Sequence, residues 1–443
     1  MATVRPSLIC GSLLAAILFS TVCVAAQTPP PTLKTLYNFT GGSTGASPQA
    51  GVVIGSGGVF YGTTSYGGTG SCSGSLPGCG TVFSLNMPTS PGGPWTETVL
   101  YSFIGGSDGA QPDTGLVIGK NGVLYGTTRY GGMGVLGSGT VFSLTPPTST
   151  AGPWTETVVY RFIAISDGFN PNSVMVVGSA GVLYGTTQYG GIVTSSCLLG
   201  CGTVFSLKPP TSPGGAWTEA VLHAFTGYPS DGAFPFAGVA IGKGNVLYGT
   251  TFNGGVGSSS FGTVFNLKPP TSAGGGWTES VLYSFTGGND GFYPYTGVMI
   301  GSGGVLYGTA YQGGASGYGT VFSLTPPASA GGTWTETALY NFTGGSDGGY
   351  PYAAVAMRGG VLYGTTRYGG LAFGLSGYGT VFSLTPPTSP GGVWTQTVLH
   401  TFTGGRDGSD PDAGVVISRG GVLYGTTHYG GSSGDGTVFA LKP

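Results

Sequence analysis

The sequence predicts an all-β protein, a seven-bladed β-propeller with four strands in each blade. Three observations lead to this prediction. One unit of about 60 residues recurs seven times, and repeats of this length are typical of solenoids and propellers. Each unit contains four short runs of β-branched and aromatic residues between turn formers, which is the pattern of strands. The first and last pieces of the chain each match part of a unit, and together they complete one.

Short motifs mark every copy of the unit. The tetrad Tyr-Gly-Thr-Thr (Tyr-Gly-Thr-Ala in one copy) recurs with gaps of 64, 59, 64, 59, 56 and 61 residues. Its copies begin at Tyr61, Tyr125, Tyr184, Tyr248, Tyr307, Tyr363 and Tyr424. A second tetrad, Gly-Thr-Val-Phe, begins at Gly80, Gly139, Gly202, Gly262, Gly319, Gly379 and Gly436. Because the copies fill nearly all of residues 27–443, we expect this stretch to be a single domain.

The sixth copy illustrates the elements of one blade. Its expected strands cover residues 354–357, 361–366, 380–384 and 394–402. A tight turn separates the first two strands, a Gly-rich loop the next two, and a long Pro/Gly connection precedes the fourth. Helical periodicity is absent, and with 92 Gly in 443 residues a helix would lose about 1 kcal/mol at each internal Gly.

The two ends of the chain predict how the ring closes. Residues 33–39 match only the fourth strand of the unit, and the chain ends after a third strand at residues 437–441. We therefore expect the N-terminal strand 33–39 to complete blade seven, which leaves no open sheet edge between the termini. A linear β-solenoid, the alternative, gives no reason for this complementary truncation.

Composition excludes some classes of protein. The chain has 13 Lys+Arg and 15 Asp+Glu, a formal net charge of −2, and no basic cluster. Nucleic-acid binding depends on displacing counterions with Lys and Arg, so we expect no nucleic-acid partner. A disordered polar chain is also excluded, because aromatic residues make up 12% of the sequence and charged residues only 6%.

The N-terminus has the features of an export signal over residues 1–26. Arg5 precedes an apolar stretch at residues 8–24, and the small residues Ala25 and Ala26 follow at the expected cleavage site. An uncleaved anchor helix is the alternative, because the apolar stretch is just long enough to span a bilayer. We expect cleavage, no membrane association afterwards, and a secreted protein, extracellular or periplasmic.

The repeat also resembles a known family. Gly-Val-Leu-Tyr-Gly-Thr-Thr, then Tyr-Gly-Gly, then Gly-Thr-Val-Phe-Ser-Leu is similar to the GloVer tandem repeat over residues 33–443. The resemblance implies an exported bacterial protein in a surface or extracellular setting, and it brings no agreed reaction and no catalytic residues. Many relatives have a C-terminal anchor segment. We expect no such segment here and therefore favour free secretion over surface attachment.

Four cysteines remain outside the signal and form two local pairs, each just before a Gly-Thr-Val-Phe motif. The pairs are Cys72 with Cys79, and Cys197 with Cys201. In an exported protein we expect two disulfides that staple long loops. A four-cysteine zinc site would require blades one and three to meet across blade two, and the spacings do not match zinc pairs.

Differences among the copies indicate where a ligand could bind. In a propeller, the loop that enters the first strand of each blade borders the mouth of the channel. These loops are aromatic in blades four to six and acidic in blades two and seven. A position just after Tyr-Gly-Thr-Thr, on the same face, also varies and includes two arginines and a histidine. The candidate ligand-binding residues are Phe234, Phe236, Phe292, Tyr293, Tyr295, Tyr350, Tyr352, Asp113, Asp410, Asp412, Arg129, Arg367 and His428.

A repeated Asp-Gly turn offers a second set of carboxylates. Its aspartates are Asp108, Asp167, Asp231, Asp290, Asp347 and Asp407. A ring of carboxylates could bind calcium. Because nearly every blade has the turn, we favour a structural role in which each Asp accepts backbone N–H groups. We expect no metal and no cofactor.

These features favour a non-catalytic binding module for carbohydrate or another neutral extracellular polymer. Sugar C–H faces pack on aromatic rings, while Asp, Asn and Gln accept hydroxyl hydrogens. The rings could instead only fill gaps between blades. A structural or adhesive surface protein that binds other proteins is the first alternative. A polysaccharide hydrolase or lyase that uses Asp113, Asp410 or Asp412 is the second, but the three histidines are scattered and suggest no Ser-His-Asp triad.

Overall fold

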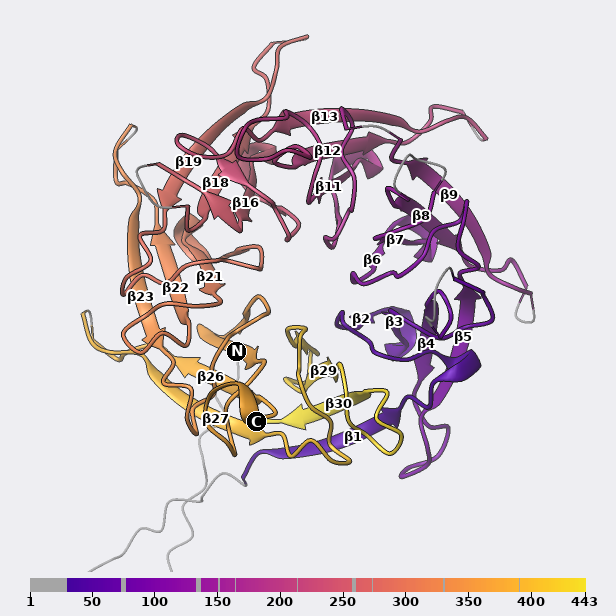
Figure 1. Ribbon diagram of the computed structural model, residues 1–443. Helices are drawn as coiled ribbons and strands as arrows, with labels where there is room; N and C mark the ends of the chain where they lie inside the picture. The colour runs from indigo at the N-terminus through magenta and orange to yellow at the C-terminus, as the bar shows by residue number, and fades with distance from the viewer. Residues whose placement is uncertain are drawn as a thin grey trace, which may run out of the picture.

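Seven antiparallel four-stranded sheets form a ring around a central channel, as predicted (Figure 1). The computed structural model describes residues 30–72, 77–132, 137–149, 152–163, 165–212, 214–256, 260–272, 274–329, 331–389 and 391–443. The predicted signal peptide, residues 1–26, lies outside this part of the chain. No α-helix occurs in the described segments, which agrees with the all-β prediction.

Each blade adds its strands from the channel outward (Figure 1). Blade one contains β2 (Val53–Ile54), β3 (Phe60–Thr64), β4 (Thr81–Asn86) and β5 (Thr96–Ser102). Blade two contains β6 (Val117–Ile118), β7 (Leu124–Thr128), β8 (Thr140–Thr145) and β9 (Thr155–Arg161). Blade three contains β10 (Val176–Val177), β11 (Leu183–Thr187), β12 (Thr203–Lys208) and β13 (Thr218–Ala224). Blade four contains β15 (Ala240–Ile241), β16 (Leu247–Thr251), β18 (Thr263–Lys268) and β19 (Thr278–Ser284).

The remaining blades follow the same order. Blade five contains β20 (Met299–Ile300), β21 (Leu306–Ala310), β22 (Thr320–Thr325) and β23 (Thr335–Asn341). Blade six contains β24 (Ala356–Arg358), β25 (Val361–Thr366), β26 (Thr380–Thr385) and β27 (Thr395–Thr401). Blade seven contains β28 (Val416–Ile417), β29 (Leu423–Thr427), β30 (Thr437–Lys442) and β1 (Thr32–Asn38).

Short elements complete the description. A two-residue pair, β14 (Gly232–Ala233) with β17 (Asn253–Gly254), lies beside blade four. The 3-10 turns are η1 (Gly42–Thr44), η2 (Ser56–Gly58), η3 (Lys120–Gly122), η4 (Ser179–Gly181), η5 (Lys243–Asn245), η6 (Ser302–Gly304) and η7 (Gly374–Ser376). The innermost strands are only two or three residues long. In blade six, residues 354 and 355 were predicted in the strand but precede β24, which begins at Ala356.

The ring closes through its termini. Strand β1 pairs with β30 in antiparallel register, from Thr32 opposite Lys442 to Asn38 opposite Thr437. In Figure 1 the indigo β1 runs along the outer side of the yellow β30. The N-terminal strand is therefore the outermost strand of blade seven, as predicted, and covers the edge that β30 would otherwise expose.

The hydrophobic core lies in the seams, which we define as the interfaces between neighbouring blades. Phe103, at the end of the outer strand of blade one, meets Phe142 of blade two edge to face, with ring centroids 5.1 Å apart. Both rings are fully buried. Equivalent pairs occupy the other seams: Phe39 with Phe83, Phe162 with Phe205, Phe225 with Phe265, Phe285 with Phe322, Phe342 with Phe382, and Phe402 with Phe439. Such pairs add about 1 kcal/mol each beyond the area they bury.

The Tyr-Gly-Thr-Thr motif supports this packing. A Cβ at Gly126 would lie 2.5 Å from Cζ of Phe142, so only glycine fits beneath the ring. The second Thr of the motif, Thr128, shares a 2.8 Å hydrogen bond with Thr140 of the next strand. The first Thr bonds across the seam. In the closing seam, Thr426 Oγ1 donates to the Ala50 carbonyl at 3.0 Å.

The two predicted disulfides are confirmed: Cys72 is bonded to Cys79, and Cys197 to Cys201. Each links the loop between the second and third strands to the start of the Gly-Thr-Val-Phe segment of its blade. Within the described segments, no helix has the length and apolar character needed to cross a membrane.

Candidate functional site

Three positions of each blade form the surface that we call the channel mouth. Two lie in the loop that enters the innermost strand, on either side of a proline, and the third directly follows the second strand. The first position holds Ser47, Gln111, Asn170, Phe234, Tyr293, Tyr350 and Asp410. The second holds Gln49, Asp113, Asn172, Phe236, Tyr295, Tyr352 and Asp412, which all line the channel. The third holds Ser65, Arg129, Gln188, Phe252, Tyr311, Arg367 and His428.

All of the predicted ligand-binding residues except Phe292 belong to the channel mouth. Phe292 directly precedes Tyr293, the first mouth position of blade five, and its N–H donates to the Gln312 carbonyl. Its ring packs on Phe261, with centroids 5.2 Å apart, and it is not among the channel-lining residues. Phe292 contacts the mouth through the ring of Tyr293, with centroids 4.8 Å apart.

The first position of the mouth has a left-handed backbone in every blade. All seven residues have φ between 53° and 60° (Tyr293, for example, at 59°). Tyr293 is held there by two backbone hydrogen bonds, from its N–H to Phe261 O and from Tyr311 N–H to its own carbonyl. This conformation costs a residue with a Cβ about 1 kcal/mol or more. Although 92 residues of the chain are Gly, none of the seven copies has Gly here, so a varied set of side chains is kept at this cost.

Blades four, five and six contribute a continuous aromatic half of the mouth. Tyr295 lies at its centre and contacts four rings, at centroid distances of 4.6 to 5.4 Å. These partners are Phe236, Phe252, Tyr311 and Tyr352. The ring of Phe252 also stacks on Tyr293 at 4.3 Å. Every ring in this half stays partly exposed, and those of Phe236, Tyr295 and Tyr352 line the channel.

Blades six and seven contribute a charged sector beside these rings. Asp412 is buried, and its carboxylate lies 3.1 Å from Arg367 Nε and 2.8 Å from His428 Nδ1. The Arg367 guanidinium also lies over the ring of Tyr352, 5.0 Å from its centroid. Burial, and then repulsion by Asp412, raise the pKa of Asp410 to about 6. Arg367 therefore joins the aromatic half to the charged sector.

Asp113 of blade two lies on the other side of the histidine. Its carboxylate is 3.7 Å from Arg129 Nη1. Burial raises the pKa of Asp113, whereas the nearby Ser65 hydroxyl and the charges of Arg129 and His428 act in the opposite direction. Asp113 and Asp412, which belong to blades two and seven, thus both lie near His428.

The mouth opens into a cavity of about 1000 Å³, at the upper end of the range for small-molecule sites. Below the mouth its wall is apolar, with residues such as Val53 and Val176 from the innermost strands. Several buried polar atoms of the mouth have no hydrogen-bond partner among the described residues, and they include Ser65 Oγ, Asp113 Oδ1, Arg129 Nε, Gln188 Oε1 and His428 Nε2. Such atoms are costly to bury unpaired, so they are suited to bind water or a polar ligand.

The repeated Asp-Gly turns lie outside the mouth and are held by local hydrogen bonds. Asp108 Oδ2 accepts from the Ile104 N–H at 2.9 Å and from the Tyr101 hydroxyl at 3.1 Å. The same pattern recurs at the equivalent turns. These bonds support the structural role predicted for the aspartates.

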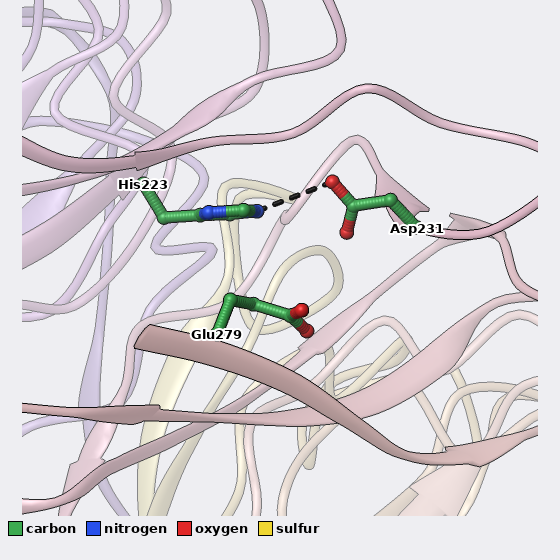
Figure 2. Close-up of side chains that lie close together, drawn as sticks. All are labelled: His223, Asp231 and Glu279. Carbon is green, nitrogen blue, oxygen red and sulfur yellow. Dashed lines mark hydrogen bonds and ion pairs between the residues drawn. The ribbon is translucent and has the colours of Figure 1, made fainter. Parts of the chain in front are cut away.

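Two of the turns have a histidine in place of the tyrosine. His223 Nε2 lies 3.2 Å from Asp231, and His400 Nε2 lies 3.0 Å from Asp407. In the first case Glu279 of the next blade approaches the same point, as Figure 2 shows. Sequence reasoning missed this group because it treated the histidines as scattered. Aligning the copies, in which these histidines replace a repeated tyrosine, would have revealed it.

Among three solved structures that align with this chain, the one with a TM-score above 0.5 shows likeness of fold. Trypanosoma rangeli sialidase in complex with sialic acid aligns at 9% identity and a TM-score of 0.38, over 94% of this chain and 59% of the sialidase. A fungal alcohol oxidase of the AA5 family, in complex with copper, aligns at 13% identity and a TM-score of 0.51, over 93% of this chain and 76% of the oxidase. A glucose dehydrogenase aligns at 12% identity and a TM-score of 0.42, over 93% of this chain and 99% of that one. The chain thus spans 59% of the length of the sialidase.

No curated protein matches the sequence. The family model for the Gloeobacter/Verrucomicrobia repeat matches it twice, over residues 22–199 and 191–439. These matches cover most of the chain, and they agree with the GloVer resemblance of the repeat motifs. The protein is a member of the Gloeobacter/Verrucomicrobia repeat family.

Proposed function

We propose that this protein is a secreted, non-catalytic binding module that recognises carbohydrate at the channel mouth. One observation carries the proposal: aromatic side chains of blades four to six and acidic side chains of blades two and seven line a single cavity of about 1000 Å³, at Phe236, Tyr295, Tyr352, Asp113 and Asp412. Aromatic faces stack on the C–H surface of a sugar ring. Carboxylates, guanidinium groups and unpaired buried atoms at the edge supply the directional hydrogen bonds that hydroxyl groups require.

Export is supported by two features. The N-terminal sequence has the pattern of a secretory signal. The two disulfides are of the kind that persists in oxidising compartments. A glycan or another neutral polymer outside the cytoplasm is the partner that fits this location and the low charge of the chain.

The acidic residues of the mouth fit a role in binding better than a role in hydrolysis. Glycoside hydrolysis requires two carboxyl groups that are free to face the scissile bond. Asp412 is instead engaged by Arg367 and His428, and Asp113 faces Arg129. We therefore place a hydrolase or lyase second, tested by release of reducing ends from a polysaccharide panel.

A glycan array followed by titration calorimetry tests the proposal. We expect binding of at least one glycan, weakened about tenfold or more when Tyr293 and Tyr295 are both replaced by Ala. Tyr228→Ala is the control, because Tyr228 is 43% exposed in a turn outside the mouth. Equal loss in the control, or no binding across a broad array of neutral and acidic glycans, contradicts the proposal.

A further inference from the structure

One seam brings together three metal-ligating side chains that lie outside the channel mouth (Figure 2). His223 comes from β13, the outer strand of blade three, and Asp231 from the turn that follows it. Glu279 comes from β19, the outer strand of blade four. One ligand atom from each residue lies within 4.8 Å of the other two. The side chains of His223 and Asp231 are 21% and 10% exposed, so the group is close to solvent but largely enclosed.

The other seams serve as internal comparisons, and none of them within the described residues combines all three groups. The histidine position holds tyrosine in the seams after blades one, two, four, five and seven. A neutral tyrosine donates to the aspartate but is a poor metal ligand. The glutamate position holds Gln396 in the seam after blade five. His400 has an aspartate, but Leu33 of the closing strand occupies the glutamate position.

Within the part of the chain that the structure describes, no ion pair joins the Glu279 carboxylate to a basic side chain. Asp231 Oδ2 accepts hydrogen bonds from Thr226 N–H at 2.9 Å and from His223 at 3.2 Å. Glu279 contributes a buried Oε1 that has no hydrogen-bond partner among the described residues. Figure 2 shows its carboxylate pointing toward the gap between His223 and Asp231. A bound cation would pair the free oxygen and neutralise both carboxylates.

We propose that this seam binds one divalent transition-metal ion of the zinc class, through His223 Nε2, a carboxylate oxygen of Asp231 and a carboxylate oxygen of Glu279. An imidazole nitrogen with two carboxylates is a donor set for Zn²⁺ and its neighbours, whereas Ca²⁺ and Mg²⁺ prefer oxygen donors alone. Zinc–nitrogen and zinc–oxygen bonds are about 2.0 to 2.2 Å long, so the three atoms need to close by only about 1 Å around the ion. Water supplies the remaining ligand. The ion joins blade three to blade four.

Zinc titration of the metal-free, untagged full-length protein tests the site. Calorimetry and elemental analysis after dialysis are expected to give one Zn²⁺ per chain, and Ca²⁺ under the same conditions none. Glu279→Gln, which introduces the residue found at 396, should weaken Zn²⁺ binding about tenfold or more. His223→Tyr introduces the residue that most other seams have at this position and should also weaken Zn²⁺ binding about tenfold or more. Circular dichroism and the melting temperature without metal verify that each variant is folded.

A matched variant separates this site from the other histidines. His400→Tyr changes a histidine–aspartate pair without a glutamate, so Zn²⁺ affinity should stay within about twofold of the parent protein. Zinc should also raise the melting temperature of the parent and of His400→Tyr by about 2 °C or more, but not that of Glu279→Gln. Failure of the parent to bind Zn²⁺, or equal binding by Glu279→Gln and the parent, overturns the proposal.

Discussion

Ionisation of the glutamates in the seams should make this propeller less stable as pH rises. Glu336 on β23 is half-buried, and its Oε1 has no hydrogen-bond partner among the described residues. Burial, and then the negative charge of Asp290, raise the pKa of Glu336 from 4.5 to about 7. The folded protein therefore holds this proton more tightly than the unfolded chain does. The resulting contribution to stability is complete below pH 4.5 and is lost as pH rises through about 7.

The size of the effect follows from this difference in pKa. The change from 4.5 to about 7 corresponds to at most about 3 kcal/mol. Solvent reaches part of the Glu336 carboxyl group and screens its charge, so we expect about 1 kcal/mol. Replacing Glu336 by Gln keeps the shape and removes the ionisable group. The chain already has this arrangement one seam further on, at Gln396.

Denaturant unfolding of the parent and of Glu336→Gln at pH 5 and pH 8 measures the effect. We expect the free energies of unfolding to agree closely at pH 5, and the variant to be more stable by about 1 kcal/mol at pH 8. Gln396→Glu is the reverse control. At pH 8 its free energy of unfolding should be about 1 kcal/mol lower than that of the parent, because the new carboxyl group would lie beside Asp347. A gain of equal size at both pH values, or lower stability of Glu336→Gln at pH 8, refutes the reasoning.

Three other substitutions test how the ring is held together, each by its melting temperature and unfolding free energy. Gly126→Ala places a Cβ 2.5 Å from the Phe142 ring and should cost about 2 kcal/mol; unchanged stability would show that the seam can relax. Thr426→Val removes the hydrogen bond to Ala50 across the closing seam and should cost about 1 kcal/mol, whereas the same stability as the parent would mean that water replaces the bond. Asp412→Asn removes the negative charge from a buried ion pair and should cost about 2 kcal/mol; a stabilised variant would contradict the pairing with the neighbouring arginine and histidine.

Much of the architecture was predictable from the sequence, because in a repeat protein each copy displays the same local pattern. The number of blades follows from counting Tyr-Gly-Thr-Thr, and the closing strand from the match of residues 33–39 to the fourth strand of the unit. The disulfides were also predictable, because Cys72 and Cys79, like Cys197 and Cys201, are separated by only a few residues. Patterns of this kind depend on strand periodicity and short-range spacing, which the order of residues contains directly.

Contacts between blades were decided by the tertiary structure alone. The sequence indicated that Asp113 and Asp412 lie on one face, but not that His428 lies near both. It did not place Glu279 beside His223 either, because their proximity depends on how one blade rotates onto the next and on the side-chain conformations across the seam. A repeat specifies what each blade contains. The side chains that differ between blades acquire partners only when the closed ring fixes the angle and distance between neighbours.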